Sequence, residues 1–289
     1  MAFSPSALVV SFLLSASALT AASPWRSLWN GKDLSGWDTY LAIPHPSAQI
    51  PGLPKKPDGQ YTEPLGLGRD PLKVFAVQNV DGRPAIRISG QVSGTLSTQE
   101  VLENYHLRVQ FKWGEKRWPP QENYKRDSAV FFHGHDLGYA PTRAWPRCLE
   151  FQVTETDVGD VSTVTTKAMS RGRPQPNTPA IYDPKGEPIL LLTRAPHKGA
   201  NNHCTKSADH EKPHGEWNTL ELFCVADEAV LVVNGGMVMR VQQIQRQKGD
   251  GWESLTKGFI CLQSKNAEIY YRDVEVRAIT RLPAEFDGK

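Results

Sequence analysis

The sequence has very little helical periodicity, and this lack already limits the fold. Over its 289 residues, one weak helix candidate lies at residues 241–247 and one short turn at residues 252–255. A parallel α/β fold needs a crossover, usually a helix, between successive strands. We therefore exclude such a fold and expect antiparallel strands in two packed sheets.

Cysteine pairs with the CxxC spacing are also missing, which excludes a zinc ribbon. The four cysteines stand far apart, and Cys224 and Cys261 lie in apolar, strand-like runs where small buried residues are common. Cys148 and Cys204 lie in polar, Pro-rich surroundings. We predict that a disulfide, if the protein is exported, joins Cys148 to Cys204.

An excess of charge of one sign is absent as well. Lys and Arg number 33 against 31 Asp and Glu, a formal net charge of +2. So balanced a composition gives no support for nucleic-acid binding, and we expect no nucleic-acid partner. No segment after residue 22 approaches the 18 consecutive apolar residues of a membrane helix, so we expect no integral membrane segment in the mature chain.

The N-terminus carries an apolar run at residues 8–14, followed by small residues up to Ala22. Such a run is too short to span a bilayer and is typical of a signal peptide, although no Lys or Arg precedes it. A disordered or membrane-embedded N-terminus is the alternative. We expect residues 1–22 to be a signal peptide, residues 23–289 to form a single domain, and the protein to be periplasmic or extracellular.

Short alternating segments dominate the rest of the chain. Apolar and polar residues alternate at residues 105–113 and 149–154, as they do in half-buried strands. The pairs at residues 81–82 (Asp-Gly) and 234–235 (Asn-Gly) suit type I′ hairpin turns. We predict an all-β fold, an antiparallel two-sheet sandwich or jelly roll. Two long Pro-rich stretches, residues 43–71 and 171–207, are expected to be loop insertions over one end or face of it.

A series of short blocks resembles, in order, the 3-keto-disaccharide hydrolase domain family. They lie at residues 29–37, 105–113, 127–134, 149–153, 215–221, 233–235, 259–263 and 271–274. The sequence departs from the family's pattern at His133, where members often have Arg, and at Ala129, where many have Gly. The resemblance implies a concanavalin A-like sandwich that cleaves glycosides already oxidised to a ketone at carbon 3 of the sugar.

A ketone at carbon 3 makes the hydrogen on carbon 2 acidic. A base can remove that proton, the substituent on carbon 1 then leaves, and addition of water completes a net hydrolysis. The route needs a base, a group that stabilises the enolate oxygen and an acid for the leaving oxygen. It does not need the paired carboxylates of an ordinary glycosidase.

Glu150 is the candidate base, because it shares a polar strand face with Gln152 and matches the family's Glu-x-Gln strand. The alternative is a solvated carboxylate on the outer face. Lys112, on a second polar strand face with Gln110, either stabilises the enolate or is an ordinary exposed lysine. His133 is the candidate acid or substrate contact. We predict that Glu150, Gln152, Lys112 and His133 converge on one cleft.

Further substrate contacts are expected from Gln110, Gln263, Trp145 and Tyr139, the last two because aromatic faces stack on sugar rings. No cofactor and no metal ligand are expected. A divalent metal near His133, His135 or Asp157 is the alternative, since a His-x-His pair suits a metal but no third ligand follows at fixed spacing. The acidic residues 155–160 form either a solvated turn or a calcium loop.

These observations predict an exported carbohydrate-active protein, a hydrolase or lyase that cleaves 3-keto-glycosides. A non-catalytic carbohydrate-binding module is the main alternative, and an exported interaction domain without a sugar site is another.

Overall fold

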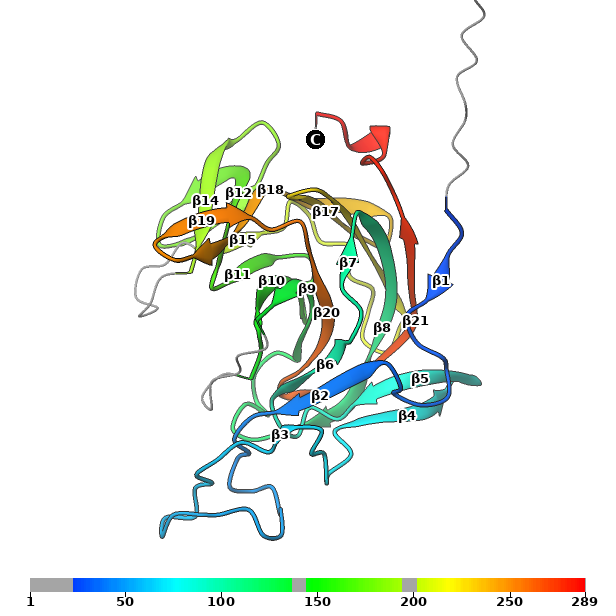
Figure 1. Cartoon of the computed structure of the whole chain (residues 1–289), viewed down its shortest axis with the longest axis vertical. Coiled ribbons are helices and arrows are strands. Elements are labelled where there is room, and N and C mark those ends of the chain that lie inside the picture. The colour runs from blue at the N-terminus through cyan, green and yellow to red at the C-terminus, as the bar shows by residue number, and fades with distance from the viewer. Residues whose placement is uncertain (1–22, 137–143, 194–201, 289) are drawn as a thin grey trace, which may run out of the picture.

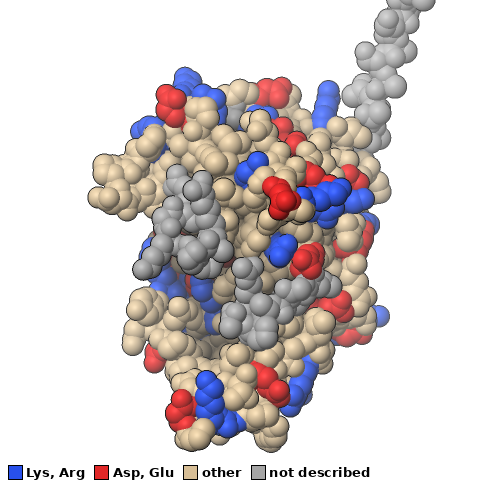
Figure 2. Space-filling model, turned by 60° about the vertical axis from the view of Figure 1, so that its left-hand side comes forward, with Lys and Arg blue, Asp and Glu red and all other residues tan. Residues whose placement is uncertain are grey.

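Two β-sheets packed face to face make up the described part of the chain, residues 23–136, 144–193 and 202–288 of a computed structural model (Figure 1). The helical structure in these ranges is one short 3-10 turn, Ala284–Phe286. None of the described helical structure is long and apolar enough to cross a membrane. The predicted all-β, two-sheet sandwich is confirmed. On the side shown in Figure 2, both signs of charge are interspersed over the surface.

The first sheet, called sheet A, has the order β4-β5-β21-β8-β16-β17-β18, and the short β1 pairs with the end of β21. All of its described pairings are antiparallel. Its strands are β1 (Arg26–Ser27), β4 (Phe75–Val80), β5 (Arg83–Ile88), β8 (Tyr105–Arg117), β16 (Asn218–Val225), β17 (Glu228–Val233), β18 (Gly236–Lys248) and β21 (Ala267–Ala278).

The second sheet, sheet B, has the order β3-β2-β6-β20-β9-β10-β11-β15 and continues through the parallel pair β15–β13 to β12, which also pairs with β14 and β18. Its first strands are β2 (Trp37–Leu41), β3 (Gly66–Leu67), β6 (Gly94–Thr98), β9 (Asp127–His135), β10 (Arg147–Thr154), β11 (Val161–Val164) and β20 (Lys257–Ser264). The others are β12 (Thr166–Gln175), β13 (Thr178–Tyr182), β14 (Glu187–Leu192), β15 (His203–Thr205) and β19 (Gly251–Ser254), and β7 (Leu102–Glu103) pairs with β20.

The predicted hairpin turns are confirmed at both places. Asp81 and Gly82 join β4 to β5 with φ angles of 51° and 76°, and Asn234 and Gly235 join β17 to β18 with 48° and 83°. Positive φ at both central residues is the type I′ geometry, which matches the twist of the flanking strands.

The predicted helix at residues 241–247 is wrong, because these residues belong to β18. This strand pairs with β17 of sheet A in its first half and with β12 and β19 of sheet B in its second half. Gln243 has a φ of 51° at a shift in the pairing register. The bulge puts buried Val241 and Ile244 three residues apart, a spacing that imitates a helix. The turn predicted at residues 252–255 is mostly strand β19.

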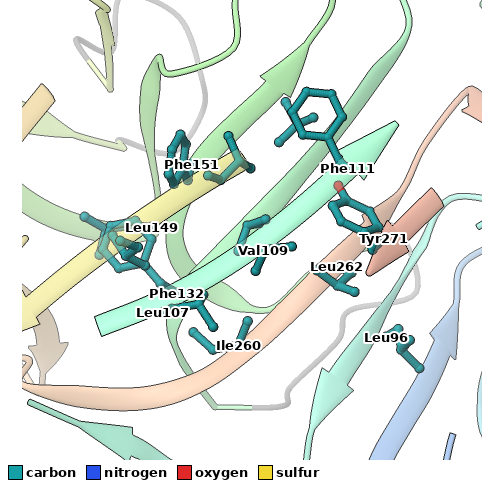
Figure 3. Close-up of a cluster of buried hydrophobic side chains, with 14 of the residues drawn as sticks. Leu96, Leu107, Val109, Phe111, Phe132, Leu149, Phe151, Ile260, Leu262 and Tyr271 are labelled. Atoms are coloured by element: carbon teal, nitrogen blue, oxygen red, sulfur yellow. The ribbon is translucent and has the colours of Figure 1, made fainter. Parts of the chain in front are cut away.

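The core between the sheets comes from the alternating apolar residues. Leu107, Val109 and Phe111 of β8 face Leu149 and Phe151 of β10 across the sandwich, and each is at most 1% exposed (Figure 3). Burial of one such side chain contributes about 1.5–3 kcal/mol. The same alternation turns the intervening polar residues of each strand to the outside of the sandwich.

The two Pro-rich stretches differ from each other. Residues 43–71 are mostly loop, as expected, and the loop is tied to itself by the Tyr61 hydroxyl, which donates to the carbonyl of Ala48 and accepts from the amide of Ile50. Residues 171–207 were expected to be loop as well, but they include β13, β14 and β15. Pro188 fits into β14 because, among the described strands, this one pairs with β12 alone, so no second described neighbour requires its missing N–H.

The predicted disulfide is also wrong, since all four cysteines are free and buried. Cys148 packs with Phe131 and Cys261 on the outer face of sheet B, whereas Cys204 packs in the core between the sheets. The two thiols therefore point to opposite faces of the sheet.

Titration of thiols in unfolded, unreduced protein should accordingly give four reactive groups per chain. A protein without a disulfide exposes every cysteine on unfolding, whereas one bridge would reduce the count to two. The same titration on the folded protein should be slow, because burial raises the pKa of Cys204, Cys224 and Cys261 to about 12 and hides the reactive thiolates.

Candidate active site

Glu150 lies in the middle of the outer face of sheet B. Cross-strand pairing puts it opposite Phe131 of β9 and Ser162 of β11, and Phe131 is in turn opposite Cys261 of β20. Residues directly opposite each other point to the same face. These directly opposed residues form a row across the sheet, and the row extends beyond Ser162 to His203 on β15.

Two glutamines stand beside this row. Gln152 lies two residues along β10 from Glu150, and Gln263 of β20 makes a side-chain hydrogen bond to the Glu150 carboxyl. Within the described residues, the Oε1 atoms of Gln152 and Gln263 are buried without a hydrogen-bond partner. Buried acceptors of this kind are rare in folded proteins.

A fixed cation lies on the same face. Lys265 follows β20 directly and forms an ion pair with Asp127 at the start of β9. Asp127 also accepts a hydrogen bond of 2.8 Å from the Thr154 hydroxyl, which in turn lies 2.5 Å from the Gln152 amide nitrogen. This chain of contacts holds the Lys265 ammonium close enough to act electrostatically on Glu150.

Burial raises the pKa of Glu150 from 4.5 to about 7, and the negative charge of Asp127 adds to this shift. Lys265, His203 and the hydrogen bond from Gln263 oppose it. Glu150 remains partly exposed. A carboxyl that titrates near neutral pH and is still accessible can both accept and return a proton, as a general base must.

The aromatic side chain of Trp145 lies at the edge of this face, on the side of the Pro-rich loop at residues 43–71. The ring of Trp145 lies 6.3 Å from that of Phe131 and 5.9 Å from the Lys265 ammonium, measured between centroids and to Nζ. Lys265 also lines a pocket of about 270 Å³ whose walls come from the loops near Pro44, Val92 and Pro120. Figure 2 turns this side forward and shows Lys or Arg atoms set back in a recess.

Lys112 and Gln110 do not reach this face, so their predicted convergence with Glu150 is wrong. Both lie on the outer face of sheet A, where the Lys112 ammonium is 3.0 Å from Asp81 and Gln110 accepts a 2.8 Å hydrogen bond from Arg272. The core of the sandwich separates them from Glu150. Alternation showed correctly that β8 has a polar face, but not which sheet it belongs to.

His133 does not reach the site either. It has a φ of 51°, which interrupts the alternation of β9, and its side chain is fully buried, 6.2 Å from the ring of Tyr105 between centroids. Neither ring nitrogen has a partner among the described residues. Burial lowers the pKa of His133 to about 3, so the ring is neutral and cannot act as the predicted acid at the surface.

The remaining predicted residues have mixed outcomes. Gln152, Gln263 and Trp145 lie with Glu150, and Tyr139 lies outside the described residues. His135 is half-buried, and Asp157 is paired with Lys125 at 2.7 Å. In the described ranges, no three His, Cys, Asp or Glu side chains are grouped to hold a metal ion.

The sequence interpretation missed the two neighbours of Glu150 in its row. Ser162 and His203 are joined by a contact of 2.8 Å between Oγ and Nδ1, and His203 Nε2 lies 2.8 Å from Asp160. The sequence held a signal for Ser162, because it lies two residues after Asp160, and residues two apart in an extended segment share a face. His203 gave no signal, since its strand β15 lies within the stretch that was expected to be loop.

The family scan matches the chain to the 3-keto-alpha-glucoside-1,2-lyase-like domain over residues 24–277. The chain therefore belongs to this family of carbohydrate-active proteins, and the resemblance seen in the sequence blocks is confirmed. A search of curated proteins found no match.

Several solved structures are similar in shape. A candidate glycosyl hydrolase of Parabacteroides distasonis covers 89% of this chain, and 100% of its own length, with 16% identity and a TM-score of 0.46. A carbohydrate-binding module of Bacillus subtilis covers 71% of this chain and 92% of its own length, with 6% identity and a TM-score of 0.40. LamAcat of Zobellia galactanivorans covers 90% and 98%, with 12% identity and a TM-score of 0.38. At such identities the activities of these proteins do not transfer to this chain.

The raised pKa of Glu150 has a consequence for stability. Between pH 4.5 and about 7 the unfolded chain ionises Glu150 before the folded protein does, so stability is lost as the pH rises through this window. Gln cannot ionise. The difference in melting temperature between Glu150→Gln and wild type should therefore grow in favour of the variant from pH 4 to pH 8.

Glu275→Gln is the control, because Glu275 is an ion-paired carboxylate on sheet A, 2.7 Å from Arg108. The melting temperature of Glu275→Gln should not increase relative to that of wild type between pH 4 and pH 8. A pH-independent difference for Glu150→Gln would show that Glu150 ionises as it does in water.

Proposed function

We propose that this protein cleaves glycosides of 3-keto sugars by elimination across carbons 1 and 2, with Glu150 as the base. The observation that carries the proposal is the position of Glu150, whose pKa is about 7, on the outer face of sheet B, where it is partly exposed and lies beside the ion-paired ammonium of Lys265. Membership of a family described as 3-keto-alpha-glucoside-1,2-lyase-like supports the same chemistry.

In the first step, Glu150 takes the proton from carbon 2. The electron pair of the C–H bond forms a double bond between carbons 2 and 3, and the ketone oxygen becomes an enolate. The Lys265 ammonium, held by Asp127, stabilises the new negative charge. Because this charge develops only during the reaction, the interaction favours the transition state over the bound substrate.

In the second step the enolate collapses. Its electrons form the double bond between carbons 1 and 2, the bond from carbon 1 to the leaving oxygen breaks, and that oxygen takes up a proton. The product is an unsaturated 3-keto sugar. Addition of water at carbon 1, with return of the proton from Glu150 to carbon 2, gives the free 3-keto sugar and makes the whole reaction a hydrolysis.

The surroundings of Glu150 supply binding groups for a sugar. The side-chain amides of Gln152 and Gln263 lie beside Glu150, and each supplies donors and an acceptor for ring hydroxyls once its side chain turns to the surface. Trp145 offers an aromatic surface at the edge of the face, and the pocket beside Lys265 has room for a second ring. The same binding groups would also serve a non-catalytic carbohydrate-binding module, which is the second candidate function and predicts binding without turnover.

A panel of 3-keto-glucosides, assayed beside their unoxidised parents, tests the proposal. Wild type should cleave only the keto forms, because only these have an acidic hydrogen on carbon 2. Glu150→Gln keeps the shape and the hydrogen-bonding capacity but removes the base, so turnover should fall by roughly 100-fold or more. Glu275→Gln should retain wild-type turnover.

Binding of the keto sugars without any turnover would favour the binding module. Equal turnover of keto and parent glycosides would exclude an elimination that depends on the ketone.

The two lysines give an independent test. Lys265→Met removes the group assigned to the enolate oxygen and should lower kcat by roughly 100-fold. Lys112→Met removes the lysine that the sequence alone suggested, and kcat should remain near that of wild type, since Lys112 lies on the other sheet. The opposite result would place the active site on the outer face of sheet A.

A further inference from the structure

A continuous chain of three polar side chains ends beside Glu150. The Oγ of Ser162 is 2.8 Å from Nδ1 of His203, and Nε2 of the same ring is 2.8 Å from Oδ2 of Asp160. Both ring nitrogens are thus used. Such a chain can pass a proton along its length without any movement of the backbone.

The far end of the chain is rigidly built. The Asp160 side chain is only 5% exposed, and its second oxygen accepts a 2.9 Å hydrogen bond from the Lys206 amide. The backbone carbonyl of Asp160 accepts a 2.9 Å hydrogen bond from the backbone N–H of Gln152. This bond ties Asp160 to β10, the strand of Glu150.

The near end of the chain lies next to the base. Ser162 of β11 is paired directly with Glu150 of β10, so the Cβ atoms of the two residues are about 4.5–5.5 Å apart. The charge of His203 also acts on Glu150. A sugar whose carbon 2 contacts Glu150 therefore has its carbon 1 substituent within one side chain's reach of this hydroxyl.

We infer that Asp160, His203 and Ser162 form a proton relay that protonates the leaving oxygen, while Glu150 takes the proton from carbon 2. This inference rests on the proposed elimination and adds the acid that the reaction needs. Ser162 is the catalytic residue that touches the substrate, and His203 and Asp160 act through it as positioning and proton-storing residues.

The protons balance over the two halves of the reaction. As the bond from carbon 1 breaks, Ser162 gives its hydroxyl proton to the leaving oxygen and receives the Nδ1 proton of His203, which leaves a neutral imidazole. When water adds to carbon 1, a water proton passes to Ser162 and the Ser162 proton returns to His203. Glu150 returns its proton to carbon 2, and all groups are restored.

Leaving-group dependence tests the relay separately from the base. An alkyl or sugar leaving oxygen needs a proton, whereas p-nitrophenolate leaves without one. In His203→Gln and Ser162→Ala, turnover of a methyl 3-keto-glucoside should fall by roughly 100-fold or more, and turnover of the p-nitrophenyl 3-keto-glucoside should change far less. Glu150→Gln should lose turnover of both substrates equally, because both need the base.

The control is His214→Gln, since His214 contacts Glu115 at 3.1 Å and is not part of the chain to Ser162. This substitution should leave the turnover of both substrates at the wild-type rate. Ser162→Ala removes a single hydroxyl, so the same comparison of the two leaving groups can still be made with this variant if His203→Gln does not fold. Equal losses on both substrates, or no loss on either, would overturn the relay and leave the elimination standing. A wild type inactive on both would overturn the relay together with the proposed function.

Discussion

The register of β10 against its neighbours is the constraint on which the site depends. Leu149 and Phe151 are buried between the sheets, and each contributes about 1.5–3 kcal/mol by that burial. A slip of one residue would expose both and turn Glu150 into the core. The same interaction that stabilises the sandwich therefore fixes Glu150 on the outer face, opposite Ser162 and within reach of Gln263.

The electrostatics of the site come from competition between burial and partly neutralised charges. A free lysine beside Glu150 would hold the carboxyl ionised, but the ammonium of Lys265 is paired with Asp127, whose own charge opposes ionisation of Glu150. Burial is then the largest cause, and the pKa of Glu150 rises to about 7. His203 also has a carboxylate partner, because its Nε2 lies 2.8 Å from Asp160.

Much of the fold follows from alternation and turn residues, because these depend on neighbours along the chain. Glu150 and Gln152 were placed on one outer face by this reasoning, and the family resemblance singled out Glu150 among many surface carboxylates. Which sheet a polar face belongs to depends on distant pairings, so Lys112 was misplaced. His133 was predicted to join the same cleft, but a bulge in β9, which has no mark in the sequence, turns its side chain inward, where it is buried. His203 is brought to Ser162 by the β11–β15 pairing alone.

The fate of the hydrogen on carbon 2 tests elimination most directly. Cleavage of a 3-keto-glucoside by wild type in deuterium oxide, followed by nuclear magnetic resonance of the sugar product against an enzyme-free control, reports this atom. Because Glu150 remains partly exposed, the proton that it takes from carbon 2 exchanges with solvent deuterons before a proton is returned. Elimination by Glu150 therefore predicts a product that has lost its original carbon 2 hydrogen, either as the unsaturated sugar or with deuterium in that place. A released 3-keto sugar that retains the hydrogen on carbon 2, formed faster than background exchange, would contradict the mechanism.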